Sequence, residues 1–198
     1  MNIGFALTGS YCTYSQVIPM MELLARDYDL VPILSASAYS TDSRFGSAEE
    51  HIDLVKEICG QPPLHTIPEV EPIGPKKLLD ALIIAPCTGN TLAKLAHSIA
   101  DTPVTMAAKS HLRNGRPVIL AVSTNDGLAG AAENIGRLLA RRHYYFVPFG
   151  QDDPVKKPNS LIADFALIPQ TLEAALEERQ IQPILISKMC GQQDRTFL

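Results

Sequence analysis

The sequence predicts an α/β protein built on a Rossmann-like, doubly wound parallel sheet with helices on both faces. The apolar runs Ala81–Ala85 and Val118–Val122 each end in small polar residues and lead at once into a helical pattern, as buried parallel strands do. Other strand and helix patterns alternate along the chain, which indicates the doubly wound class. The 198 residues suit one domain, spanning 1–198, with a substantial core.

The other strands are predicted from short apolar segments of the same kind. Asn2–Leu7 opens the chain, Leu30–Ser35 follows the first helical pattern, and Tyr144–Pro148 follows a later one. Pro183–Ile186 is predicted to add an edge strand. Because each main strand is followed by a helical or polar segment, their carboxyl ends are expected to lie at one edge of the sheet.

Helices are predicted where apolar residues recur on one face and capping residues mark the ends. One helix is expected to end at Gly60, a second to be capped by Asp101 or Thr102, and the last to be capped by Asn159 or Ser160. The predicted helices are approximately Tyr14–Arg26, Ser47–Cys59, Thr91–Ile99, Pro103–Arg113, Leu128–Arg142 and Leu161–Gln180.

Four segments are predicted to be irregular. Ala36–Gly46 is polar and loop-like, and Phe149–Pro158 is predicted to be an exposed loop. Five prolines lie within Gln61–Pro75, a density that excludes a long helix or a central strand. Residues Cys190–Leu198 are predicted to form a frayed tail.

Small polar residues follow the predicted strands. They are Thr8–Ser10 after the first, Pro86–Thr91 after the strand at Ala81 and Ser123–Asn125 after the strand at Val118. Ligands of open α/β sheets bind at this edge, glycine allows close backbone approach, and hydroxyl and amide groups offer uncharged hydrogen bonds. The helix start after Thr8–Ser10 favours a phosphate, although an ordinary turn with a capping serine is the alternative. The sequence therefore predicts a shelf for a phosphorylated cofactor, without the G-x-G-x-x-G dinucleotide fingerprint.

Composition and charge exclude several other classes. The net charge of −4 argues against a nucleic-acid partner, and no apolar run approaches the ~20 residues that span a membrane. The start of the chain has no signal-peptide pattern. Four scattered cysteines predict reduced thiols in the cytoplasm, and five histidines without ligand spacing predict no metal site.

The strand end at Ala85–Thr91 (APCTGNT), followed by Lys94, Ala96 and Asp101, resembles the hallmark of the homo-oligomeric flavin-containing cysteine decarboxylase superfamily. The resemblance covers about residues 1–150. It implies a three-layer sandwich that binds FMN and assembles as a trimer or a multiple of trimers, with the flavin near an interface between protomers. The superfamily's cofactor contacts map onto Thr8, Gly9, Ser10, Ser35, Ser37, Pro86, Thr88, Gly89, Asn90, Ser123 and Asn125.

Across nearly the whole chain the sequence is similar to one family in this superfamily, the B subunits of dipicolinate synthase. That family implies oxidation of a dihydro precursor from the lysine branch to pyridine-2,6-dicarboxylate, in the mother-cell cytoplasm of an endospore former. It also implies a partner A subunit, through which NADP or NAD would act. The blocks that carry this resemblance are Thr8–Tyr14, Arg44–Gly46, Glu71–Lys76, Met106–Lys109, Val122–Asp126, Tyr145–Asp152 and Lys156–Ser160.

Two departures from the superfamily pattern leave the catalytic residues unknown. The decarboxylase histidine is missing, because Pro72 stands at about its place, and His51 lies too early and is expected to be a surface histidine on a helix. Thr124-Asn125 replaces a Met-Asn pair. These departures favour an oxidoreductase subunit. The alternatives are a non-catalytic subunit that stabilises or regulates the A subunit, and a flavin-dependent decarboxylase.

A dicarboxylate substrate requires cationic side chains. Arg44 follows the second predicted strand, and Lys157 lies in the loop before the last predicted helix. Both positions are expected at the mouth of the shelf, so both are predicted to bind substrate, with a solvated surface charge as the alternative. The helical segments Leu92–Ala96 and Val104–Ala108 are candidates for interfaces between protomers, although core packing explains them equally well.

Overall fold

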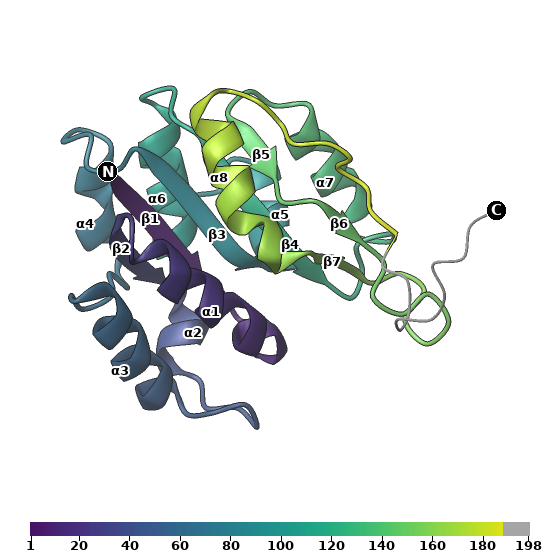
Figure 1. Ribbon diagram of the computed structural model, residues 1–198, viewed down its shortest axis with the longest axis horizontal. Helices are drawn as coiled ribbons and strands as arrows, with labels where there is room; N and C mark the ends of the chain where they lie inside the picture. Colours follow the sequence, from purple (N-terminus) through teal and green to yellow (C-terminus); the bar gives the residue numbers. More distant parts are fainter. Residues whose placement is uncertain (188–198) are drawn as a thin grey trace.

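The computed structural model, which describes residues 1–187, contains one seven-stranded sheet in the order β2-β1-β3-β4-β7-β6, with β5 also paired to β4 (Figure 1). β1 to β5 pair in parallel, whereas β7 pairs antiparallel with both β4 and β6. The sheet is therefore the predicted parallel sheet with a short antiparallel extension. The strands are β1 Asn2–Leu7, β2 Asp29–Leu34, β3 Ala81–Cys87, β4 Val118–Thr124, β5 Tyr144–Phe146, β6 Phe149–Gly150 and β7 Leu161–Ala163.

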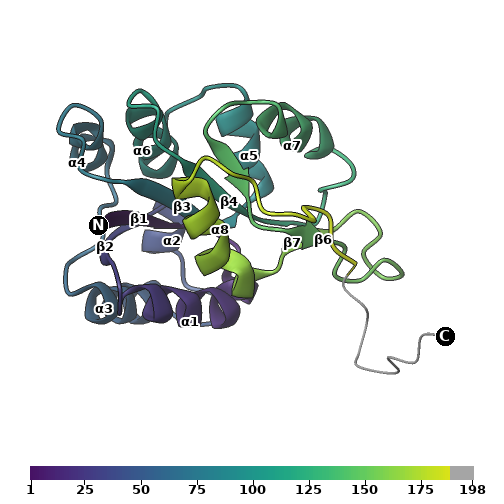
Figure 2. The ribbon, with the colours of Figure 1, turned by 45° about the horizontal axis from the view of Figure 1, so that its top comes forward.

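Helices cover both faces of the sheet. Figure 2 shows α1 and α3 on one face and α4, α5, α6 and α7 on the other, and α8 packs against α1. This three-layer arrangement confirms the predicted fold class. The α-helices are α1 Tyr14–Leu24, α2 Ala36–Ser40, α3 Ala48–Cys59, α4 Ile67–Val70, α5 Gly89–Ala96, α6 Pro103–Leu112, α7 Ala132–Leu139 and α8 Ile168–Leu176, and the 3₁₀ turns are η1 Tyr11–Thr13, η2 Glu71–Ile73 and η3 Phe165–Leu167.

Local sequence signals explain where several elements begin and end. Ser47 and Glu50 form a capping box at the start of α3, and Gly60 ends that helix in the left-handed conformation at φ 67°. Thr102 caps α6 by accepting from the backbone of Thr105, as predicted. Every residue of β3 is buried, which explains why its sequence is a continuous apolar run.

The region after β5 differs most from the prediction. Leu161–Gln180 is not one helix, because Leu161–Ala163 forms β7 beside the end of β4, and the helical part begins only after Asp164 caps η3. The predicted exposed loop at Phe149–Pro158 is wrong at its start, since Phe149 and Gly150 are buried in β6. A three-residue strand carries too little alternation to be distinguished from one helical turn.

Smaller corrections concern element length. Ala36–Ser40 of the predicted loop forms α2, because Ser35 caps it by accepting from the amide of Ala38. The helix predicted over Leu128–Arg142 is reduced to α7. The predicted edge strand is reduced to a single bridge between Phe149 and Leu185, and the predicted frayed tail at 190–198 lies outside the described residues.

Buried His111 gives the fold a predictable dependence on pH. The side chain of His111 on α6 is fully buried, its Nε2 lies 3.1 Å from the carbonyl oxygen of Pro117, and its Nδ1 has no partner among the described residues. Burial lowers the pKa of His111 to about 4. Between this value and the ordinary pKa near 6.5 the unfolded chain binds the proton and the folded chain does not, so stability falls as the pH falls through this window.

We therefore expect the free energy of unfolding to drop by about 2 kcal/mol between pH 7 and pH 5 from this residue alone. Urea denaturation of the wild type and of His111→Gln at both pH values measures it, since glutamine can still donate to Pro117. His111→Gln should lose that part of the pH dependence, whereas the control His97→Gln, at an exposed residue, should keep it. An equal pH dependence in His111→Gln and the wild type would contradict the assignment.

Candidate functional site

Two adjacent hollows lie at the carboxyl ends of the strands. The first has a volume of about 420 Å³ and the second about 270 Å³, and they share Gly9 and Thr88. Of the predicted cofactor residues, Thr8, Gly9, Ser35, Ser37, Thr88 and Asn90 line the first hollow. Gly9, Ser10, Thr88, Gly89, Ser123 and Asn125 line the second.

Pro86 is the one predicted cofactor residue that lines neither hollow. It is buried in β3, and its carbonyl oxygen accepts a hydrogen bond from Thr8 Oγ1 at 2.6 Å. Thr8 Oγ1 in turn accepts from the amide of Thr88 at 3.3 Å. Thr8 thus joins the ends of β1 and β3, and Pro86 supports the shelf from behind.

Glycine keeps the shelf open at two places. A Cβ atom on Gly9 would lie 2.9 Å from Ser37 Oγ, and one on Gly89 would lie 2.7 Å from Thr124 Oγ1, both closer than side-chain atoms normally approach. Hydroxyl groups surround the first of these positions, where the Ser35 and Ser37 oxygens are 3.1 Å apart. The shelf is a narrow cradle of uncharged donors and acceptors.

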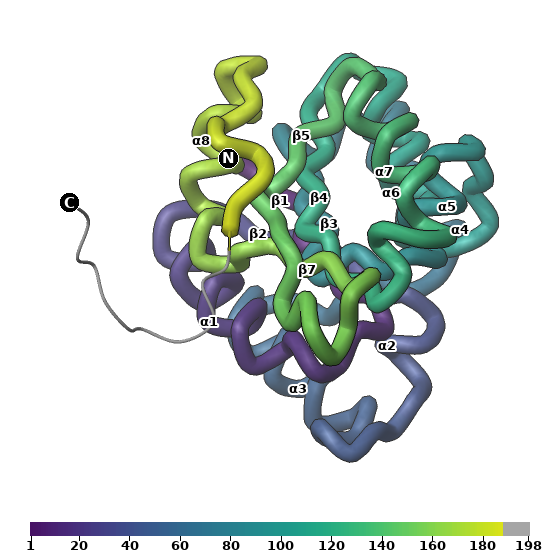
Figure 3. The backbone as a smooth tube through the Cα atoms, turned by 90° about the vertical axis from the view of Figure 1, so that its right-hand side faces the viewer, coloured from purple at the N-terminus to yellow at the C-terminus, as the bar shows by residue number. Residues whose placement is uncertain are grey.

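Ser10 closes the cradle on the side of β4. Its hydroxyl oxygen lies 2.7 Å from that of Ser123, a buried residue near the end of β4. Figure 3 looks onto this end of the molecule and shows the loop after β6 beside the segment that leads into α1. The second hollow is therefore bounded by the turns after β1 and β4 and by a loop distant in sequence.

The start of α5 directs polar groups into the first hollow. Thr88 caps this eight-residue helix, with its Oγ1 3.4 Å from the amide of Thr91 and 3.0 Å from Thr91 Oγ1. The first amides of a helix have no intrahelical acceptor. Together with the helix dipole they favour an anion at this end.

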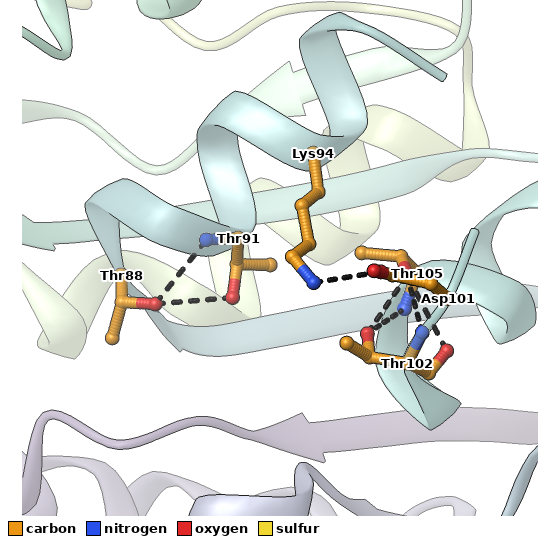
Figure 4. A network of polar contacts seen from close by, with 6 residues as sticks. All are labelled: Thr88, Thr91, Lys94, Asp101, Thr102 and Thr105. Carbon is orange, nitrogen blue, oxygen red and sulfur yellow. Dashed lines mark hydrogen bonds and ion pairs between the residues drawn. The ribbon is translucent and has the colours of Figure 1, made fainter. Parts of the chain in front are cut away.

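Lys94 is a site residue that the sequence prediction did not include. It lies two turns along α5 from Thr88, lines the first hollow, and holds Asp101 Oδ1 at 2.7 Å (Figure 4). The hydrogen bond from Lys94 lowers the pKa of Asp101. The spacing of Thr88, Thr91 and Lys94 at i, i+3 and i+6 places them on one helix face, which is the signal that could have identified the lysine.

The two cations predicted to bind substrate have different surroundings. Lys157 lines the second hollow and pairs with Asp152 at 3.2 Å. Arg44 is exposed, with its guanidinium carbon 4.8 Å from the centre of the Phe45 ring, and it lines neither hollow. The structure therefore places Lys157, but not Arg44, at the shelf.

His51 lies on α3, as expected, and is half-buried there rather than on the open surface. Its ring meets the Tyr14 ring edge-on at 4.9 Å, and its Nδ1 lies 2.6 Å from the carbonyl oxygen of Ser47. No histidine lines either hollow among the described residues. The four titratable side chains of those linings are Cys12, Lys94, Asp152 and Lys157.

The helical segments Leu92–Ala96 and Val104–Ala108, which are candidates for interfaces between protomers, pack their apolar residues into the core. Leu92 and Leu95 on α5, and Val104 and Ala108 on α6, are buried against the sheet. Core packing therefore explains the apolar residues of both segments. Within residues 1–187, no group of histidine, cysteine and carboxylate side chains could hold a metal ion, and no helix has the length and apolarity needed to cross a membrane.

The sheet and its polar shelf agree with a match of residues 1–145 to the flavoprotein family model, and the chain belongs to the flavoprotein family. It is 46% identical, over 191 residues that make up 96% of each chain, to the B subunit of dipicolinate synthase from Bacillus subtilis (strain 168). The resemblance to these B subunits that the sequence predicted is therefore confirmed.

Comparison with solved structures supports the similarity to dipicolinate synthase B subunits and extends the shared fold to another flavin-binding protein. The crystal structure of the dipicolinate synthase B subunit from Bacillus halodurans C matches with a TM-score of 0.87 and 46% identity, covering 95% of this chain and 97% of that one. DmrB from Burkholderia xenovorans in complex with FMN, described as a cubic protein cage for redox transfer, matches with a TM-score of 0.66, covering 89% and 95% of the two chains. Its 18% identity shows a shared fold alone.

Proposed function

We propose that this chain is an FMN-binding B subunit of dipicolinate synthase, which takes part in oxidising a dihydrodipicolinate to dipicolinate during sporulation. The observation that carries the proposal is the pair of adjacent hollows, which two glycines keep open and hydroxyl groups line. The 46% identity to the dipicolinate synthase B subunit of Bacillus subtilis over nearly the whole chain supports the choice of pathway.

The residues of the first hollow fit a phosphorylated flavin. The hydroxyls of Ser35, Ser37 and Thr88 and the first amides of α5 would hold the phosphate, and Gly9 leaves room for the cofactor to lie across the shelf. Lys94 adds a positive charge to the same hollow. The mixture of one cation and several neutral donors suits a phosphate monoester.

The second hollow would hold the substrate. Lys157 there would exchange its ion pair with Asp152 for one carboxylate of the substrate, and Ser10, Ser123 and Asn125 offer neutral partners. Bound FMN would supply a hydride acceptor beside it. The chain's own residues would bind and orient the dihydropyridine. On becoming aromatic, the ring would give a hydride to that acceptor and a proton to solvent water.

The lack of a histidine in the two linings favours this function over decarboxylation. Among the described residues the linings contain no histidine. Asp152 is their single carboxylate, and its Oδ2 is paired with Lys157. A non-catalytic role, in which this chain only stabilises or regulates the A subunit, is the second candidate. It is favoured by the same shortage of titratable groups.

The A subunit is the proposed partner, and NADP or NAD would act through it because this chain lacks the dinucleotide fingerprint. We also propose that the chain works as one domain in a trimer or a multiple of trimers, in the mother-cell cytoplasm. One continuous core from Ile3 to Ala175 supports the single domain. Exposed Leu128 and Leu139 offer apolar surface for contacts between protomers.

Calorimetric titration with FMN and with riboflavin tests the cofactor site. The two ligands differ only in the phosphate, so FMN should bind at least about tenfold more tightly, a difference of about 1.4 kcal/mol. Inorganic phosphate should compete with FMN and not with riboflavin. Equal affinity for the two flavins, or no binding of FMN, would exclude the proposed phosphate site.

A further inference from the structure

A third hollow lies apart from the shelf and is lined by residues of α5, α6 and the segment 141–144. Helices α5 and α6 lie side by side on one face of the sheet (Figure 2). We call it the α5–α6 pocket. Its volume is about 300 Å³, and Leu95, Ile99 and Leu112 contribute apolar walls. It shares no residue with either hollow of the shelf. Its size is at the lower end of the range of small-molecule sites.

The rim of the α5–α6 pocket is basic although the chain as a whole is acidic. Lys109, Arg141, Arg142 and His143 line it, and no carboxylate does so among the described residues. The net charge of the chain is −4, so a basic cluster without acidic neighbours departs from the average surface. Such a cluster favours an anionic ligand.

Two of these cations are available to a ligand. Arg141 is occupied, because its guanidinium donates to the carbonyl oxygens of Leu95 at 3.0 Å and Ala96 at 2.7 Å. Lys109 and Arg142 form no ion pair within residues 1–187. Arg141 therefore holds the end of α5 in place at the pocket, and Lys109 and Arg142 supply positive charge to an anionic ligand.

The backbone around the pocket is held in an unusual conformation. Ser98 and His143 have φ angles of 59° and 67°, and both line the pocket. Non-glycine residues in this left-handed region are uncommon and persist where the surroundings fix them. His143 is fixed by the amide of Val118, which donates to its carbonyl oxygen at 2.7 Å. The rim of the pocket is therefore preformed, because its backbone conformation does not depend on a ligand.

The phenol side chain of Tyr144 also lines the α5–α6 pocket. Tyr144 begins β5 and borders the pocket. Burial raises the pKa of Tyr144 to about 12, so the hydroxyl keeps its proton near neutral pH and remains a donor. An apolar wall, a neutral donor and two unpaired cations are the complement of a small aromatic acid.

We propose that the α5–α6 pocket binds a small aromatic carboxylate, with the ring against Leu95, Ile99 and Leu112 and the carboxylate at Lys109 and Arg142. This site is independent of the flavin shelf and of the proposed function. The ligand needs an apolar ring to contact the walls of the pocket and a negative charge to pair with the basic residues of its rim. A neutral aromatic compound of the same shape would lack the second interaction.

The test is a titration of the isotope-labelled full chain with 2-naphthoate, followed by amide chemical shifts. We expect saturable shifts at Ser98, Ile99 and His143, smaller shifts at Gly9 and Thr88, and no binding of the neutral 2-naphthamide. The double variant Lys109→Gln/Arg142→Gln should raise the dissociation constant at least about fivefold. The matched control Arg26→Gln/Lys56→Gln, at exposed residues of other elements, should leave it unchanged.

Three results would overturn the proposal. The first is saturable shifts confined to the shelf. The second is an unchanged dissociation constant in the double variant, with its fold verified by circular dichroism. The third is no shift at the pocket while sedimentation shows an oligomer that Ile99→Glu disperses. That result would assign this face to contacts between copies of the chain.

Discussion

Gly9→Val is expected to weaken FMN binding by about 100-fold or more, which corresponds to at least about 2.7 kcal/mol. Gly9 lines both hollows, and its missing side chain leaves a gap in which a Cβ would lie only 2.9 Å from Ser37 Oγ. Valine would place three carbon atoms in the space proposed for the cofactor. The backbone of Gly9 lies outside the left-handed region, so a fold that is otherwise intact is expected.

Gly136→Val is the matched control. Gly136 lies in α7, where a Cβ would meet nothing within 4 Å, so this variant should bind FMN as the wild type does. Calorimetry with FMN measures both variants, and thermal unfolding shows that each is folded. A folded Gly9→Val protein that retains the affinity of the wild type for FMN would show that the cofactor site is misplaced.

The sequence was sufficient to predict the parallel part of the sheet. β1, β3 and β4 are buried almost throughout and β2 over most of its length, and this burial produces the apolar runs that predict them. The antiparallel extension was missed because β6 and β7 have two and three residues. Their position depends on pairing with the distant end of β4, which no local pattern records.

For the candidate site, the residues at strand ends could be predicted from the sequence, whereas those placed by a loop or by helix phase could not. Small polar residues at strand ends are local features, and ten of the eleven predicted cofactor residues line the two hollows. Arg44, which is expected at the mouth, lines neither hollow, because the direction of a loop after its strand is not set by local sequence. Lys94 was missed as a site residue because its importance comes from helix phase and from tertiary pairing with Asp101.

Production of dipicolinate should depend on both subunits. This chain alone is expected to form little product, because the linings of its two hollows contain no histidine among the described residues and its sequence has no dinucleotide fingerprint. Adding the A subunit, a nicotinamide cofactor and FMN should raise the rate at least about 100-fold, or about 2.7 kcal/mol of transition-state stabilisation. Lys157→Gln should raise KM more than it lowers kcat, because Lys157 is proposed to bind a carboxylate.

The proposed role in dipicolinate formation is tested most directly by the ultraviolet absorbance of dipicolinate. The absorbance is measured for each subunit alone, for their mixture, and for the mixture containing Gly9→Val. We expect product from the complete mixture, little from either subunit alone, and a loss of activity with Gly9→Val that excess FMN partly restores. Equal rates for the A subunit with and without this chain would contradict a role in the oxidation. Full activity from this chain by itself would contradict the proposed division of work between the two subunits.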